Sequence, residues 1–177
     1  MTYRFGAPGG LSSSQSSKIA SLGSWGYWSD ATHTSGFPQS ITATTRTQFT
    51  VDGAGVTTET SNLYPGDSGL FSSSAISPVS SGDTFNLRMG VTVVPSSVSQ
   101  GEYVEVQLDI GDVSEINIVT DRIELTKGIG VTHVKTLSFP IFCLDTFVAN
   151  GGRIYLTPSI DITVYDKTIF LQRTYLP

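Results

Sequence analysis

The tetrapeptide Gly66-Asp67-Ser68-Gly69 is the part of the sequence whose residue types come closest to a catalytic motif. A serine nucleophile needs a histidine to take its proton and a carboxylate to orient that histidine. The histidine that precedes Ser68 is His33, which lies in a segment rich in glycine and serine. The glycine spacing also differs by one place from that of a G-x-S-x-G nucleophile elbow. We therefore interpret Pro65-Gly66-Asp67 as a β-turn and predict that the protein is not an enzyme.

Metal and cofactor sites are the other chemistry that the residue types would permit. His33 and His133 are the two histidines, and neither has a neighbouring Cys or His at metal-ligand spacing. Asp109, Asp112 and Glu115 cluster near a predicted turn, where carboxylates can bind Ca²⁺. Their spacing matches no calcium-binding loop, which favours a solvated acidic hairpin. We expect no metal and no cofactor.

Four aromatic residues near the start of the chain are the remaining candidates for a binding site: Trp25, Tyr27, Trp28 and Phe37. One interpretation is a platform that stacks on sugar rings. The other is a set of anchors that hold a flexible segment in an apolar pocket, because each ring buries a large area at low rotamer cost. The second interpretation is favoured, since a segment rich in Gly and Ser needs something to hold it. We predict that these four residues contact a partner protein.

Near-strict alternation of apolar and polar residues marks the C-terminal half of the chain, and the predicted strands begin at residue 41. In residues 103–110 every second side chain is apolar, which places one set on a buried sheet face and the other toward solvent or a neighbour. Turn sequences such as Asn150-Gly151-Gly152 separate the alternating runs. About eight strands at this spacing, without a helical period, predict an all-β antiparallel sandwich or jelly roll. Strands are expected at residues 41–51, 56–61, 84–94, 103–110, 116–126, 133–142, 153–156, 160–165 and 169–175.

Composition divides the chain into two parts. Residues 1–40 contain much Gly and Ser and few β-branched residues, which predicts an extended N-terminal arm, and residues 41–177 form the sandwich domain. The last predicted strand is apolar on both faces, so we expect it to pack on the core with one face and on another subunit with the other. The residues predicted at this subunit interface are Phe170, Gln172, Tyr175 and Leu176.

The charge balance excludes some partners and favours others. With 15 acidic and 10 basic residues the formal net charge is −5, and no Lys or Arg cluster is present, so no contact with nucleic acid is expected. Charged residues make up 14% of the chain, against about 25% in an ordinary soluble domain. A surface short of charge suits lateral contact with other proteins, because little charge must be desolvated on docking.

The single cysteine and the short apolar runs indicate in which cellular compartment the protein folds. Cys143 is the one cysteine and stands in an apolar run, which predicts a small buried side chain and a fold without disulfides, as in a reducing cytoplasm. The first ten residues lack the apolar core of a signal peptide. The longest apolar runs are too short to cross a bilayer, so no membrane contact is predicted.

Two runs resemble small virion structural proteins of tailed bacteriophages, among which the jelly-roll capsid decoration (cement) proteins are the nearest group. The runs are Gly82-Asp83-Thr84-Phe85-Asn86-Leu87-Arg88-Met89 and Leu156-Thr157-Pro158-Ser159-Ile160-Asp161-Ile162-Thr163-Val164-Tyr165. The resemblance implies a homotrimeric jelly roll that binds the major capsid protein on the capsid exterior and stabilises the shell, in a virion assembled in the host cytoplasm. The aromatic anchors of the arm would then contact the capsid.

An alternative from another functional class is a head-fibre or tail receptor-binding protein that recognises a host surface glycan. The two hypotheses differ in where Trp25 and Trp28 lie. Burial at a protein contact favours the decoration protein, whereas exposure in a shallow groove favours glycan recognition.

Overall fold

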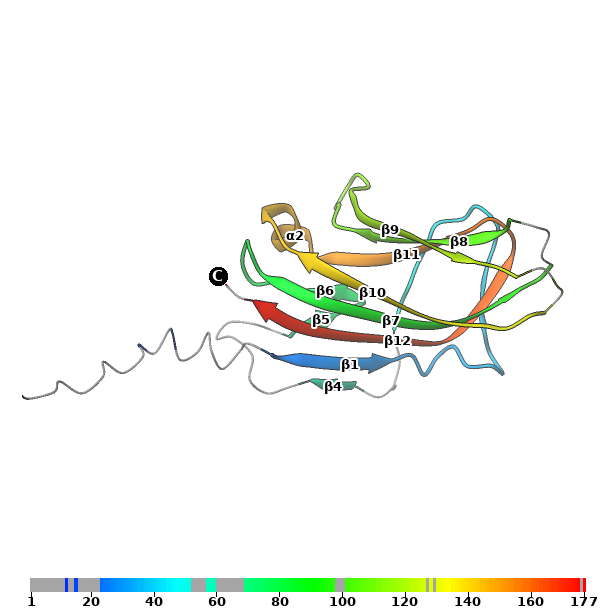
Figure 1. Cartoon of the computed structure of the whole chain (residues 1–177), viewed down its shortest axis with the longest axis horizontal. Helices are drawn as coiled ribbons and strands as arrows, with labels where there is room; N and C mark the ends of the chain where they lie inside the picture. The colour runs from blue at the N-terminus through cyan, green and yellow to red at the C-terminus, as the bar shows by residue number, and fades with distance from the viewer. Residues whose placement is uncertain are drawn as a thin grey trace, which may run out of the picture.

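The protein is a sandwich of two antiparallel β-sheets in a computed structural model (Figure 1). The structure describes residues 12, 15, 23–51, 57–59, 69–97, 101–126, 128, 130–175 and 177. Sheet A has the strand order β10-β7-β12-β1-β4 with β2 beside β12, and sheet B has the order β5-β6-β11-β8-β9 with β3 beside β11. Sheet A comprises β1 (Trp25–Ser29), β2 (Gln39–Ile41), β4 (Thr57–Glu59), β7 (Thr84–Pro95), β10 (His133–Phe142) and β12 (Ile162–Tyr175). Sheet B comprises β3 (Thr47–Gln48), β5 (Phe71–Ser72), β6 (Ala75–Ile76), β8 (Tyr103–Asp109), β9 (Asn117–Glu124) and β11 (Gly152–Pro158).

The strand pairs are nested along the chain. The innermost pair is the hairpin of β8 and β9, and β7 and β10 enclose it in the sequence and pair in the other sheet. Outside these, β11 pairs with β3 and β6, and β12 pairs with β1. A chain folded back on itself in this nested way, with successive pairs alternating between two sheets, is a jelly roll. The predicted fold class is confirmed.

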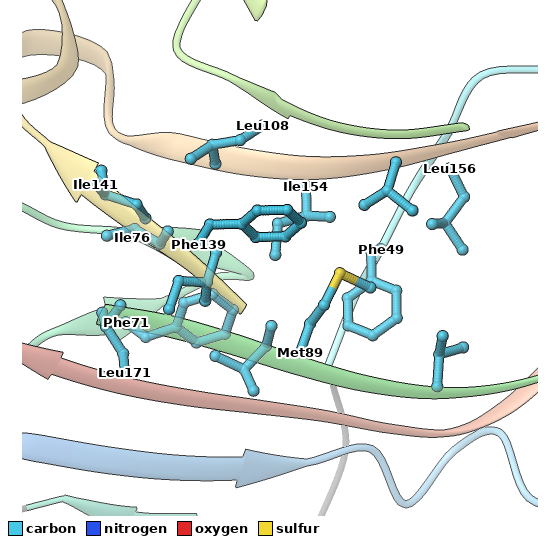
Figure 2. Packing of buried hydrophobic residues seen from close by; sticks show 14 of the residues in the cluster. Phe49, Phe71, Ile76, Met89, Leu108, Phe139, Ile141, Ile154, Leu156 and Leu171 are labelled. Atoms are coloured by element: carbon cyan, nitrogen blue, oxygen red, sulfur yellow. The ribbon is translucent and has the colours of Figure 1, made fainter. Parts of the chain in front are cut away.

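The core lies between the two sheets and follows from the alternation in the sequence. Phe49, Met89, Phe139 and Leu156 point into this space from both sides (Figure 2). Each such side chain contributes about 1.5–3 kcal/mol when it is fully buried. The buried apolar side chains of β7 include Phe85, Leu87, Met89, Val91 and Val93, and those of β8 include Val104, Val106 and Leu108.

The C-terminal part of the chain differs from the prediction in one respect. Two strands were expected over residues 160–165 and 169–175, but β12 runs through both, with a register shift between Tyr165 and Thr168. The sequence Asp166-Lys167 therefore forms a bulge and not a turn: Asp166 takes a φ of 51°, and Lys167 turns into the core. A bulge keeps the strand paired where one extra residue must be accommodated.

The helix α2 (Asp145–Asn150) was also not expected. It joins β10 to β11, and its Phe147 is buried against Gly152. A segment of six residues is too short to show a helical period in the sequence, so tertiary packing of Phe147 decides its conformation.

Strand β1 lies inside the segment 1–40 for which the sequence predicts an arm. It pairs on one side with β12 and on the other with β4, and its Trp28 is 6% exposed in the core. This part of the predicted arm is thus a strand of sheet A. Residues 1–11, 13–14 and 16–22, the remainder of the arm before β1, lie outside the described residues.

Gly26 generates a prediction about the packing of β1. A Cβ at this position would come within 2.1 Å of the buried Trp28 ring, because both residues point to the core face of the strand. We expect Gly26→Ala to lower the free energy of unfolding by about 1–3 kcal/mol through overpacking, measured by urea denaturation. Gly36→Ala is the matched control, since its Cβ would meet only Thr34 Oγ1 at 3.9 Å. Equal stability of the two variants would contradict this account of β1.

Candidate functional site

The outer face of sheet A is the surface whose side chains point away from sheet B. Its positions alternate with the buried core positions of the same strands. Its central residues, from β1, β12, β7 and β10, are Trp25, Tyr27, Ser29, Thr168, Phe170, Gln172, Asn86, Arg88, Gly90, Thr136, Ser138 and Pro140. Arg88 is the only charged residue in this set. A wide sheet face with one charge requires little desolvation of charge when a partner covers it.

Aromatic residues gather on this face because of the register between β1, β12 and β7. Tyr27 pairs with Phe170, and Phe170 pairs with Arg88 on its other side. Trp25 stacks on Phe170 with ring centroids 6.1 Å apart and an interplanar angle of 23°. The Arg88 guanidinium lies 4.9 Å from the centroid of the same Phe170 ring, which is a cation–π geometry. Trp25 remains 38% exposed.

A shallow hollow lies beside this aromatic group. It is lined by Asn86, Arg88, Ser138, Phe170 and Gln172. Two amide side chains, a hydroxyl and a guanidinium therefore surround one aromatic ring. Such a surface can donate and accept hydrogen bonds at its centre while it buries aromatic area around them, which is typical of protein contact surfaces.

The structure brings together residues that the sequence assigned to two different sites. Trp25 and Tyr27, predicted as arm anchors, lie on the same face as Phe170 and Gln172, predicted at a subunit interface. Their meeting depends on the pairing of β1 with β12, which no local pattern in the sequence encodes.

The other predicted site residues lie elsewhere. Trp28 points into the core and packs on Phe71, with ring centroids 5.1 Å apart, so it is not available to a partner. Phe37 is 79% exposed on the loop between β1 and β2. Tyr175 is exposed at the end of β12. Leu176 lies outside the described residues.

The outer face of sheet B has a different character, because it carries more charged residues and several of them pair with one another. Arg46 forms an ion pair of 2.7 Å with Asp109 and lies 3.5 Å from the centroid of the Tyr155 ring. Arg122 lies 4.2 Å from the centroid of the Tyr103 ring and within 3.6 Å of the carboxylate of Glu105. These contacts pair four charged residues within the subunit, and the face is polar and suits solvent.

The acidic cluster at residues 109–115 is organised around Asp109. Its Oδ1 accepts the backbone N–H groups of Gly111 at 2.7 Å and Ile116 at 2.9 Å, and its Oδ2 accepts a hydrogen bond from Arg46. Burial by itself raises the pKa of Asp109, but these hydrogen bonds outweigh it and hold the pKa below its ordinary value. Asp109 thus closes a turn. Among the described residues, no group of three or more His, Cys, Asp and Glu side chains is placed to hold a metal ion.

The two histidines lie far apart: His33 is in the loop between β1 and β2, and His133 is in β10. His33 belongs to a buried network: its Nδ1 lies 2.7 Å from Asp30 Oδ2, and Lys167 Nζ lies 2.9 Å from the same oxygen. Burial raises the pKa of Asp30, yet the hydrogen bonds from Lys167, His33 and the Thr32 N–H bring it below its ordinary value. His133 begins β10, at the other side of the sheet with β7 and β12 between. The histidines therefore form no common site.

A second buried ion pair was also missed in the sequence. Arg173 Nε lies 3.1 Å from Asp83 Oδ1, and both side chains are fully buried. Cys143 is buried, as predicted. Burial, and to a smaller extent the negative charge of Asp83, raise the pKa of its thiol to about 12. Lys167 and Arg173 occupy inward positions of β12 like those of Ile169 and Leu171, but the parity changes at the bulge, so the sequence alone does not reveal these positions.

Comparison with known proteins yields similar folds only. No protein-family model matches the sequence, and no curated protein matches it. The Eiger TNF from S. frugiperda is 7% identical with a TM-score of 0.50, and the match covers 85% of this chain and 90% of that chain. The PRD1 vertex protein P5 is 16% identical with a TM-score of 0.46, over 85% and 71% of the two chains. The cowpea mosaic virus top component is 13% identical with a TM-score of 0.29, over 88% and 82%.

The similarity to these structures is limited to the fold. The likeness to the TNF structure shows a shared β-sandwich and nothing about activity. The two viral structures have TM-scores below 0.5 and carry no argument of their own. No helix in the described part of the chain is long and apolar enough to cross a membrane.

His133 generates a prediction about pH. It is 7% exposed, and its Nε2 has no hydrogen-bond partner within the described structure. Burial, with a smaller effect of the Lys135 charge, lowers its pKa below the ordinary 6.5. The unfolded chain therefore binds a proton at higher pH than the folded chain, so this contribution to stability is complete above about pH 6.5 and is lost as the pH falls through the folded pKa.

The measurement is the free energy of unfolding between pH 5 and 7.5. Relative to the wild type, His133→Leu should become progressively more stable as the pH falls, because the variant has no proton to take up at this position. A constant difference between the two proteins over the whole range would show that His133 does not titrate on unfolding.

Proposed function

We propose that the protein is a structural component of a virus particle: a decoration (cement) protein that binds the outside of a bacteriophage capsid as a homotrimer and stabilises the shell. The observation that supports this most is the outer face of sheet A, where the exposed Trp25 and the half-buried Phe170 lie beside a single charge, Arg88. A catalytic centre would gather polar and titratable groups in a pocket. This face instead gathers rings and amides on an open sheet.

Physical chemistry favours self-association through this face. Aromatic residues and Arg contribute most of the binding energy in measured interfaces, and here Trp25, Phe170 and Arg88 stack as one group. A stable contact buries about 1,600 Å² in total, a size that a six-stranded sheet can supply. The paired charges on the outer face of sheet B would then face solvent in the assembled particle.

Attachment to the major capsid protein is assigned to the residues that precede β1. Their Gly/Ser-rich composition suits an extended segment that follows the surface of another protein. The capsid exterior and assembly in the host cytoplasm follow from the same proposal. Of the four predicted anchors, Trp28 is part of the core, and Trp25 and Tyr27 lie on the face that we assign to self-association, so they are not assigned to the capsid contact.

A charge placed on the outer face of sheet A tests the proposal. Ser138 is exposed and lies directly opposite Arg88 in the register of β10 and β7. We expect Ser138→Arg to convert the oligomer to monomer, because two like charges would have to be buried together. Co-sedimentation with capsids should then weaken by at least about 10-fold, because a monomer attaches through one arm and loses the avidity of the oligomer. Molar mass is measured by light scattering and capsid binding by sedimentation.

The matched control places the same side chain on the other sheet. Thr120→Arg adds the charge at an exposed position of β9, where sheet B faces solvent. It should leave both molar mass and capsid binding unchanged. If the two variants behave alike, or if the wild type is a monomer that does not bind capsids, the proposal fails.

A second candidate is a head-fibre or tail receptor-binding protein that recognises a host glycan. The observation that favours it is the exposed Trp25 ring next to the hollow with the Asn86 and Gln172 amides, since sugars stack on aromatic rings and hydrogen-bond to amides. In this case Trp25→Ala should abolish glycan-array signals of the wild-type protein while its molar mass stays the same. Absence of any wild-type glycan signal would remove this candidate.

A further inference from the structure

Lys167 brings a primary amine into the interior of the subunit, where it meets two other reactive groups. Its Nζ lies 2.9 Å from Asp30 Oδ2 and 2.9 Å from the side-chain oxygen of Gln39, Oε1. The side chains of Lys167 and Asp30 are both fully buried. A carboxylate and a carboxamide are therefore held against an amine that solvent does not reach.

Backbone contacts between three segments fix the positions of these groups. Lys167 stands at the bulge of β12, and its carbonyl oxygen accepts the N–H of Asp30, just after β1, at 2.9 Å. Gln39 belongs to β2 and pairs with Val164 of β12. The hydroxyl of Thr50 lies 3.4 Å from Nζ on another side. Groups held in this way react as if they were present at very high concentration, with effective molarities that can reach about 10⁵–10⁸ M.

The carboxamide carbon of Gln39, Cδ, is the atom that the amine would attack. It is bonded to Oε1 at about 1.23 Å, so it lies within about 4.1 Å of Lys167 Nζ. Reacting atoms in a near-attack arrangement are about 3–3.5 Å apart. The terminal torsion of a glutamine is broad, so a rotation of the amide plane can bring Cδ into this range.

Asp30 is placed to accept the proton that the ammonium group must lose before it attacks. The hydrogen bonds from Lys167, His33 and the Thr32 N–H hold its pKa below the ordinary value, so it is a carboxylate beside the ammonium. Burial favours the neutral forms of both groups, which makes proton transfer from Nζ to Oδ2 accessible. The reaction has to occur only once in each molecule, so a small population of the neutral pair is sufficient.

We propose that Lys167 and Gln39 join in an isopeptide bond. The Lys167 amine forms a bond to Gln39 Cδ, the bond between Cδ and the amide nitrogen breaks, and ammonia leaves. The ammonium group loses two protons: one remains on Asp30, which becomes a neutral acid, and the other departs with the ammonia. The reaction needs no oxidant, reductant or further reactant. The inference goes beyond the proposed function and does not depend on it.

The bond closes a long loop of the chain, because residues 39 and 167 are 128 positions apart. The sequence has a single cysteine, so no disulfide within the chain can make such a closure. A covalent link restricts the unfolded chain in the same way as a disulfide, and the effect grows with the length of the loop. The reaction also replaces a buried ion pair, whose desolvation is costly, with neutral groups.

Intact-mass spectrometry of the purified full-length protein tests the inference. The folded wild type, kept at neutral pH, should be lighter than its sequence by the mass of one ammonia. Trypsin does not cut after an acylated lysine, so digestion should release residues 19–46 joined to residues 154–173. This mapping is needed because a succinimide at Asn150-Gly151 would also release ammonia.

Two variants remove one reactant each. Gln39→Leu has no carboxamide but keeps the ion pair, and Lys167→Arg keeps a cation beside Asp30 that cannot lose its proton. Both should have the full mass of their sequences, whereas Gln172→Leu, the same change elsewhere in sheet A, should still lose ammonia. Circular dichroism confirms that each protein is folded. A folded wild type with its full mass, a loss that maps to Asn150, or a loss of water in place of ammonia overturns the inference.

Discussion

Strand β12 and the ion pair at its bulge are the features on which sheet A depends. The strand pairs with β7 along most of its length, with β1 over its second half and with β2 over its first. At the bulge between these halves, Lys167 enters the core and meets Asp30, with both side chains fully buried. Loss of one partner from such a pair costs about 3–5 kcal/mol, because the other charge stays buried and uncompensated. Asp30 directly follows β1, so this ion pair ties β1 to the centre of the sheet.

This constraint places the aromatic residues of the candidate site. Because β1 is fixed against β12, Trp25 and Tyr27 lie next to Phe170. The position of Asp30 also fixes where the following loop leaves the sheet. The network of Asp30, Lys167 and His33 therefore supports the surface that we propose for self-association, although it touches none of the proposed partners.

The alternation of apolar and polar residues predicted most of the fold, because side chains on a strand with one buried face must alternate. The long strands β7, β8 and β10 were found in this way. Alternation does not indicate which strands pair. The sequence therefore could not predict that Trp25 and Phe170 lie on the same face. It also does not say which face is buried, and Trp28 was therefore assigned to a partner when its ring belongs to the core. The buried Lys167 and Arg173 interrupt the apolar pattern, and their inward positions become visible only once the bulge sets the register of β12.

The most direct test of the account is hydroxyl-radical footprinting of the aromatic side chains, in the free subunit and in the assembled state. The central claim is that the outer face of sheet A is covered by another copy and that of sheet B is not. Trp25, Tyr27 and Phe170 should then lose reactivity on assembly, whereas Tyr103 and Tyr155 on sheet B keep theirs. Protection of Tyr103 and Tyr155 with Trp25 and Phe170 unchanged would contradict the account.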